Sequence, residues 1–170
     1  MKKLFLTLAL AFAGIMSANA QLWLGGSAGA RVQKGDFDIS IAPEIGYSFN
    51  NSPFSVAAAF NLILTKDSDL LDDGVYWGLV ASPYVRYNIT SVEKFNFFVD
   101  LTGDFYLPEV KEMGWRVGLQ PGIAWMATEH WTAAARVGFL GYNKCPLYGD
   151  QGFVMGFQAA IPTIGLYYNF

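Results

Sequence analysis

Apolar residues alternate with small or polar ones along much of this chain, and the charged residues within the alternating segments all fall on the polar side. This pattern limits the possible folds more than any other feature. In residues 36–49, apolar residues such as Ile39 alternate with small or polar ones such as Ser40. A period of two residues is typical of a β-strand with one apolar face. The alternation recurs in eight segments separated by turn signals, which predicts an all-β fold. The segments are 22–32, 36–49, 54–65, 75–89, 95–107, 114–127, 131–142 and 152–170.

Apart from Asp36 at the first position of its segment, eight charged residues lie inside these segments, and all of them share the small or polar face. The opposite, apolar face carries no charge in any segment. Arginine binds carboxylates through two parallel hydrogen bonds, so four arginines and four acids on one face predict an ion-pair network. Registers inferred from the turns place Arg31 opposite Asp38, Arg116 opposite Asp104 and Arg86 diagonal to Asp100, with Arg136 and Glu44 both near mid-height.

The residue types on the two faces predict which face is inside. The polar face contains arginine but no lysine, whereas a water-facing surface normally carries lysine and glutamate for solubility. Aromatic residues cluster at both ends of the apolar face, like the girdles of a lipid-facing barrel. We therefore expect the apolar face to point outward into lipid; a soluble, lipocalin-like barrel with its apolar face inside is the alternative. The first predicted girdle is Tyr47, Phe49, Phe54, Tyr87, Phe95, Phe97, Trp125, Trp131, Tyr168 and Phe170, and the second is Trp77, Phe105, Trp115 and Phe139.

The lysines of the predicted mature chain all lie in the connections between the predicted segments. They are Lys34, Lys66, Lys94, Lys111 and Lys144.

The first 20 residues have the features of a secretory signal peptide. Lys2 and Lys3 precede an apolar run over 4–16, and Ala18 and Ala20 form a small-residue cleavage site. The apolar run is shorter than the ~20 residues that a membrane-spanning helix needs. We therefore predict a cleaved signal peptide over 1–20 and one barrel domain over 21–170.

The chain ends in "IGLYYNF", where Ile164, Leu166, Tyr168 and Phe170 occupy alternate positions. This ending resembles the C-terminal signal of Gram-negative outer-membrane proteins, which the barrel assembly machinery reads. The whole mature chain is similar to the small eight-stranded family that includes the OmpA membrane domain and OmpX. The resemblance implies an antiparallel up-and-down transmembrane barrel, exported by the Sec pathway and monomeric in the outer membrane. It implies outer-membrane lipid, lipopolysaccharide, the assembly machinery and periplasmic chaperones as partners.

The interior of an eight-stranded barrel is just wide enough for side chains to fill. We therefore expect the charged network to plug the lumen, giving a structural or surface-interaction role. The alternative is a narrow pore that conducts small ions or solutes, since paired charges in membrane proteins can mark an ion pathway. Five tyrosines on the polar parity are predicted to join the network: Tyr76, Tyr84, Tyr106, Tyr142 and Tyr167.

The sequence argues against catalysis and against bound cofactors or metals. The single histidine, His130, falls in a predicted turn, and no Ser-His-Asp or metal-ligand cluster can be assembled around it. The acidic loop 66–74 lacks the spacing of a calcium loop. The lone Cys145 excludes an intramolecular disulfide, and without a basic stripe there is no sign of nucleic-acid binding.

Prolines within the predicted strands indicate local irregularity. Each removes a hydrogen-bond donor from the ladder, so we expect bulges at Pro43, Pro83, Pro121 and Pro162. In the last segment Gln158 falls on the outward parity, whereas Phe153 and Phe157 fall on the inward one. This predicts either a change of register near Pro162 or a protrusion of the segment above the membrane.

Overall fold

The computed structural model describes residues 20–33, 36–66, 75–107, 114–144, 151–157 and 160–170. All regular elements in these ranges are β-strands, apart from a single 3₁₀ residue at Phe157, and no helix there is long and apolar enough to cross a membrane. Residues 1–19, the acidic segment 67–74 and Cys145 lie outside the described residues, so the signal peptide and the acidic loop stay predictions. The strands are β1 (Ala20–Gln33), β2 (Asp36–Phe49), β3 (Phe54–Lys66), β4 (Val75–Val92), β5 (Phe95–Leu107), β6 (Trp115–Met126), β7 (Trp131–Arg136), β8 (Phe139–Asn143), β9 (Gly152–Gly156) and β10 (Thr163–Asn169).

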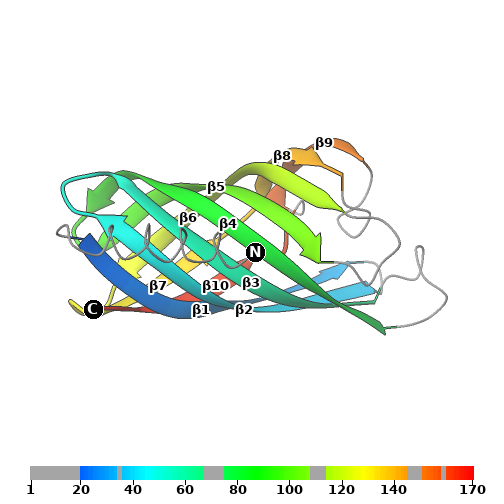
Figure 1. Cartoon of the computed structure of the whole chain (residues 1–170), viewed down its shortest axis with the longest axis horizontal. Helices are drawn as coiled ribbons and strands as arrows, with labels where there is room; N and C mark the ends of the chain where they lie inside the picture. The colour runs from blue at the N-terminus through cyan, green and yellow to red at the C-terminus, as the bar shows by residue number, and fades with distance from the viewer. Residues whose placement is uncertain (1–19, 34–35, 67–74, 108–113, 145–150, 158–159) are drawn as a thin grey trace, which may run out of the picture.

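Eight antiparallel strands close into a barrel, as predicted. Consecutive strands from β1 to β7 pair as neighbours, β7 pairs with β10, and β10 returns to β1. The two remaining strands form a separate hairpin, in which β8 extends the wall beside β6 and β9 pairs with β8 (Figure 1). Six of the eight predicted segments correspond to single strands, whereas the last two are each broken into two.

The alternation places apolar side chains outside and small or polar ones inside. In β2, Ile39 and Ile41 are exposed, whereas Ser40, Ala42 and Glu44 are buried. The prediction that the apolar face points outward is confirmed for the closed part of the wall, and its contact with lipid stays a prediction. Every outward residue of the first predicted girdle is exposed except Tyr47, which is buried, and Tyr168, which is half-buried.

The seventh segment changes face at a bulge, and this corrects part of the prediction. The register between β6 and its neighbour shifts by one residue between the pair Gly122–Arg136 and the pair Leu119–Leu140. Gly138, with φ of 73°, adopts the left-handed conformation at this step.

The shift reverses the faces that follow. Phe139, predicted in the outer girdle, is buried at 3% exposure. Tyr142, predicted inside, lies outside at 41% exposure and stacks on Trp115 with ring centroids 5.7 Å apart.

The eighth segment breaks at Pro162, where a register change was predicted. The Phe170 N–H donates to the Leu22 carbonyl at 3.0 Å, so Leu22 and Phe170 form a hydrogen-bonded pair of the antiparallel ladder. Every second pair between β1 and β10, counted from this one, should then also exchange hydrogen bonds. Continuing that register sets Pro162 opposite Ala30 at such a position, and proline has no N–H to donate. The β1–β10 ladder accordingly ends at Gly29 and Thr163.

The other prolines behave differently from the prediction. The ladders beside Pro43 and Pro83 omit residues without changing register, so neither proline produces a bulge. Pro121 remains paired with Val99, and the bulge lies on the neighbouring strand, where the Val137 N–H donates to the Pro121 carbonyl at 3.1 Å.

Two further differences from the prediction do not involve proline. A register shift that was not predicted occurs in β4 between Asn88 and Thr90. β3 runs one residue beyond its predicted end and includes Lys66.

Two apolar layers cross the lumen. Toward the end that holds the described termini, Trp23, Phe98 and Tyr167 form a buried cluster with small wall residues. Toward the opposite end, Ile63, Val80, Tyr106 and Ile161 form a second cluster. Ile161 immediately precedes Pro162, so the connection between β9 and β10 contributes a side chain to the filling of the lumen. The charged residues lie around and between these layers.

Candidate functional site: the charged lumen

Arg136, near the end of β7, is the centre of the network. Its guanidinium donates to both carboxylate oxygens of Glu44 at 3.1 and 2.9 Å, and its Nε donates to Asp100 at 2.8 Å. It also donates to the hydroxyls of Tyr167 at 3.0 Å and Tyr84 at 2.9 Å. The five groups come from five different strands, so this arginine joins the wall across the lumen.

The Glu44 carboxylate accepts hydrogen bonds from three further side chains. Ser27 donates to Oε1 at 2.6 Å and Tyr84 donates to Oε2 at 2.6 Å. Tyr167 adds a longer bond to Oε1 at 3.2 Å. A buried carboxylate with this many donors keeps its charge without water, because each lone pair has a partner. Ser27 was not among the predicted site residues.

Arg86 lies directly opposite Asp100, not diagonal to it as predicted. Two differences in register account for this: β4 continues to Val92, so the turn to β5 is tighter than the predicted 90–94, and the register then shifts by one residue between Asn88 and Thr90. Arg86 binds Asp100 through two hydrogen bonds of 2.8 and 2.9 Å, and its guanidinium lies 3.6 Å from the centroid of the Phe98 ring. Asp100 thus neutralises Arg86 and also binds Arg136.

A second ion pair lies toward the other end of the barrel. Arg116 and Asp104 are paired in register, as predicted, and hydrogen bonds of 2.8 and 2.5 Å join them. Thr102 donates to the same carboxylate at 3.0 Å. The Arg116 guanidinium lies 4.3 Å from the Phe139 ring centroid, so the reversal of faces in the seventh segment adds a cation–π contact.

The third ion pair is closer to the rim. Arg31 and Asp38 are paired in register, as predicted, with an ion pair of 2.6 Å. Thr65 donates to Asp38 at 2.5 Å. The side chains of Arg31 and Asp38 are 21% and 13% exposed, whereas those of Arg136 and Glu44 are 7% and 1% exposed.

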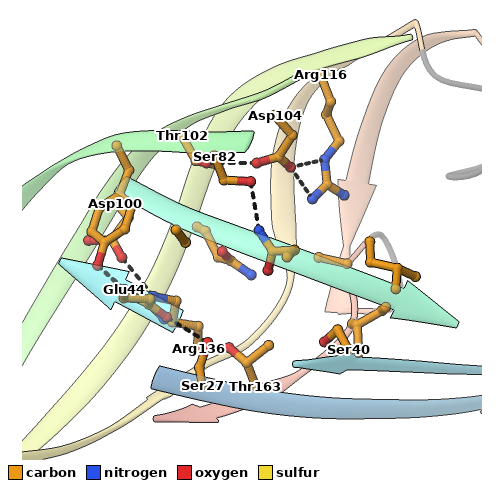
Figure 2. A pocket seen from close by; sticks show the side chains of 17 residues that line it. Ser27, Ser40, Glu44, Ser82, Asp100, Thr102, Asp104, Arg116, Arg136 and Thr163 are labelled. Carbon is orange, nitrogen blue, oxygen red and sulfur yellow. Dashed lines mark hydrogen bonds and ion pairs between the residues drawn. The ribbon is translucent and has the colours of Figure 1, made fainter. Parts of the chain in front are cut away.

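A polar cavity of about 70 Å³ lies between the two deeper groups of charges (Figure 2). Its lining combines Arg136 and Arg116 with hydroxyl groups such as those of Ser40 and Ser82. It has room for up to roughly five water molecules. The Thr163 hydroxyl lines it without a hydrogen-bond partner among the described groups, and this is a position where a water could bind.

The geometry of the lumen indicates charge neutralisation. The four arginines and four acids of the network balance, and each acid has an arginine partner. No cluster of three metal-ligating side chains occurs in the described ranges. His130 lies in the turn after β6, as predicted, where it is exposed, stacks on Tyr168 and contacts the Asn169 carbonyl at 3.0 Å. That the chain is not an enzyme stays a prediction.

The predicted tyrosines and the C-terminal residues divide as follows. Tyr84, Tyr106 and Tyr167 are buried inside, Tyr142 is outside, and the side chain of Tyr76 is not described. Of the predicted assembly signal, Ile164, Leu166 and Tyr168 lie on β10 and Phe170 follows it, with Ile164, Leu166 and Phe170 exposed. Their role in assembly stays a prediction.

Comparison with known sequences gives no further guide, because no family model and no curated protein matches this chain.

Proposed function

We propose that this chain is an integral outer-membrane β-barrel protein with a structural or surface-interaction role. One observation carries the proposal: where the barrel is closed, its outside is an apolar wall, and the four arginines and four acids of the network are paired inside. Exposed side chains such as Ile41, Phe60 and Leu101 would be unfavourable in water over so large an area. In lipid they are the expected surface, because charge in the apolar band costs ~2–4 kcal/mol at mid-depth.

The aromatic rings at the terminal end support the same proposal. Phe54 and Tyr87 are cross-strand neighbours with ring centroids 5.1 Å apart, and Trp131 contacts Tyr168 at 5.2 Å. Rings of this kind prefer the interface between lipid and water. A soluble, lipocalin-like barrel would have the opposite arrangement, with an apolar interior and a charged exterior.

The second candidate is a narrow pore, and the lumen cavity is the observation that favours it. The cavity is lined by polar side chains and has room for water, but an apolar layer lies on each side of it. Arg136 also crosses the lumen with all its bonds made. A closed lumen is therefore the better supported of the two candidates.

Heat-modifiability on a gel combined with membrane fractionation tests the proposal. The mature chain, from residue 21, is expected in the outer membrane as a monomer that migrates faster unboiled than boiled. Recovery of the folded chain in the soluble periplasm would contradict it. A planar-bilayer recording separates the two candidates, because a steady conductance of the purified protein would favour the pore.

A further inference from the structure

The lumen cavity is closed, on the side away from the described termini, by a layer that includes a residue outside the strands. This layer consists of Ile63, Val80, Tyr106 and Ile161. The first three lie on β3, β4 and β5, where pairing with neighbouring strands fixes their positions. Ile161 follows Ala160 in the connection between β9 and β10, and both residues line the cavity. The sheet therefore holds three members of this layer in place but not Ile161.

The connection packs closely against Gly29 of β1. A Cβ at Gly29 would overlap the Pro162 carbonyl oxygen and would lie 2.9 Å from Cγ2 of Ile161. Only a residue without a side chain allows the connection to come this near to the strand. The β1–β10 ladder ends at the same point, and Pro162 has no N–H to extend it. Close packing, and not strand pairing, therefore keeps Ile161 in the lumen.

The other side of the cavity is closed by groups that lie on strands. Trp23, Phe98 and Tyr167 form the buried layer there and come from β1, β5 and β10. Arg136 crosses the lumen beside them, with hydrogen bonds to groups on four other strands. Withdrawal of Ile161 would therefore open the cavity at one side only. The result would be a pocket with a closed inner side and not a pore.

The charges around the cavity are already neutralised. The three acids that line it are bound by three arginines: Arg86 binds Asp100, Arg116 binds Asp104, and Arg136 binds both Glu44 and Asp100. A charged ligand would either break one of these buried pairs or remain without a counter-charge, and both are costly. The charge balance therefore favours an uncharged ligand.

Uncharged polar groups in the lining can provide hydrogen bonds to such a ligand. Asn61, Gln120 and Thr163 all line the cavity. The Thr163 hydroxyl is buried and has no partner among the described groups. Hydroxyl and amide groups each donate and accept hydrogen bonds. A cavity of about 70 Å³ with room for roughly five waters also has room for a molecule of about five non-hydrogen atoms.

We propose that the lumen cavity is a binding site for a small uncharged molecule with hydroxyl or amide groups, which enters when Ile161 withdraws. This inference rests on the proposed function and names a ligand class for its surface-interaction role. Ordered water is the other occupant that makes the same hydrogen bonds, so the test must separate a solute from water alone.

The first part of the test measures access to the cavity in the full mature chain in lipid nanodiscs. Ser40→Cys places a thiol in the lining, in a Cys145→Ser background, and the labelling rate with a small neutral thiosulfonate reagent reports access. Ile161→Ala should raise this rate by about tenfold, because it removes most of the side chain that closes the cavity. Ile164→Ala, the same change on the outward face of β10, is the matched control and should label within about twofold of the unaltered chain.

The second part measures binding by protection of the same thiol. Ethylene glycol is the probe, at about 100 mM because a fragment of this size binds weakly. It should slow labelling of Ser40→Cys by about twofold or more, both with Ile161→Ala and, from a slower starting rate, with Ile161 in place. Acetate has the same number of non-hydrogen atoms but carries a charge, so it should not slow labelling at equal ionic strength. Equal slowing by the two probes, or no slowing by ethylene glycol, would overturn the proposal, and the latter result would mean that only water occupies the cavity.

A second variant covers the case in which Ile161→Ala does not fold. Gly29→Ala displaces the connection without changing Ile161, so it should also speed labelling. Gly26→Ala is its control on the same strand, because the new Cβ would lie 3.1 Å from the Ala42 carbonyl oxygen and away from the connection. Unchanged labelling with Ile161→Ala and with Gly29→Ala would overturn the role of Ile161. A chain that is heat-modifiable in lipid but gives these results contradicts this inference alone, whereas one that fails to enter lipid contradicts the proposed function.

Discussion

The two ends of the barrel are built differently, although the same alternation runs through both. At the end with the described termini, eight strands form a continuous ring, and ladders such as β1–β10 proceed without interruption. At the other end the last two segments bend away at Arg136 and Thr163, which are partners in the final pair of the β7–β10 ladder. A barrel closes only where each strand supplies a donor in register. One proline at a donor position and one bulge are enough to open the seam.

The ion pairs also differ between the interior of the barrel and its rim. The deep network around Arg136 joins strands on opposite sides of the lumen, whereas the pair of Arg31 and Asp38 joins two adjacent strands near the rim. Burial follows this division, since the deep side chains are nearly inaccessible and the rim pair is partly exposed. The deep network should therefore contribute much more to stability than the rim pair.

The largest expected effect is at the deep network. Arg136→Ala removes five hydrogen bonds and leaves Glu44 without its cation, which should lower the free energy of unfolding by ~3–5 kcal/mol. Combining it with Glu44→Gln should restore part of that loss, because Asp100 keeps Arg86 as its partner. Urea unfolding in lipid vesicles measures both. A single variant as stable as wild type would show that the lumen is solvated and not plugged.

The next effect concerns the outward face of the barrel wall. Leu119, exposed on β6, should not accept a charge if it faces lipid, so Leu119→Arg should cost ~2–4 kcal/mol in vesicles. Ala124→Ser, on the inward face of the same strand, is the control and should be mild, although Ala124 is closely packed. Equal losses in the two variants would mean that the faces are reversed.

A smaller effect is expected from glycines that make room for lumen rings. A Cβ at Gly122 would overlap the Phe98 ring and the Ala135 carbonyl, and a backbone atom cannot move aside. Gly122→Ala should lower the free energy of unfolding by ~1–3 kcal/mol. Gly103→Ala, where the nearest atom to the new Cβ is in the Phe105 ring at 3.3 Å, should cost less in the same unfolding assay. If both changes are neutral, the terminal-side layer is loosely packed.

The smallest effect is predicted at the rim. Arg31→Ala should lower the free energy of unfolding by only ~0–1 kcal/mol, because a partly exposed ion pair is screened by water and salt. The loss should shrink further as the salt concentration rises. A loss as large as that of Arg136→Ala, measured in the same vesicles, would remove the distinction between the deep network and the rim.

Much of this molecule follows from local rules that a sequence displays. A period of two residues sorts side chains to two faces wherever a strand forms, so the closed ring, the outward isoleucines and the inward charges were predictable. The pairs of Arg31 with Asp38 and of Arg116 with Asp104 were predicted from registers inferred from the connections between adjacent strands, and both occur. Even the break at Pro162 has a local cause.

Tertiary structure decided what depends on register across several strands. The tighter turn after β4 and the shift at Asn88 together made Asp100 the direct partner of Arg86, and the bulge at Gly138 moved Phe139 inside and Tyr142 outside. No local pattern reports such shifts, because one inserted residue reverses every later face without changing composition. The convergence of Ser27, Tyr84 and Tyr167 on Glu44 likewise exists only once the sheet is closed, because hydrogen bonds across a lumen depend on curvature that no single strand encodes.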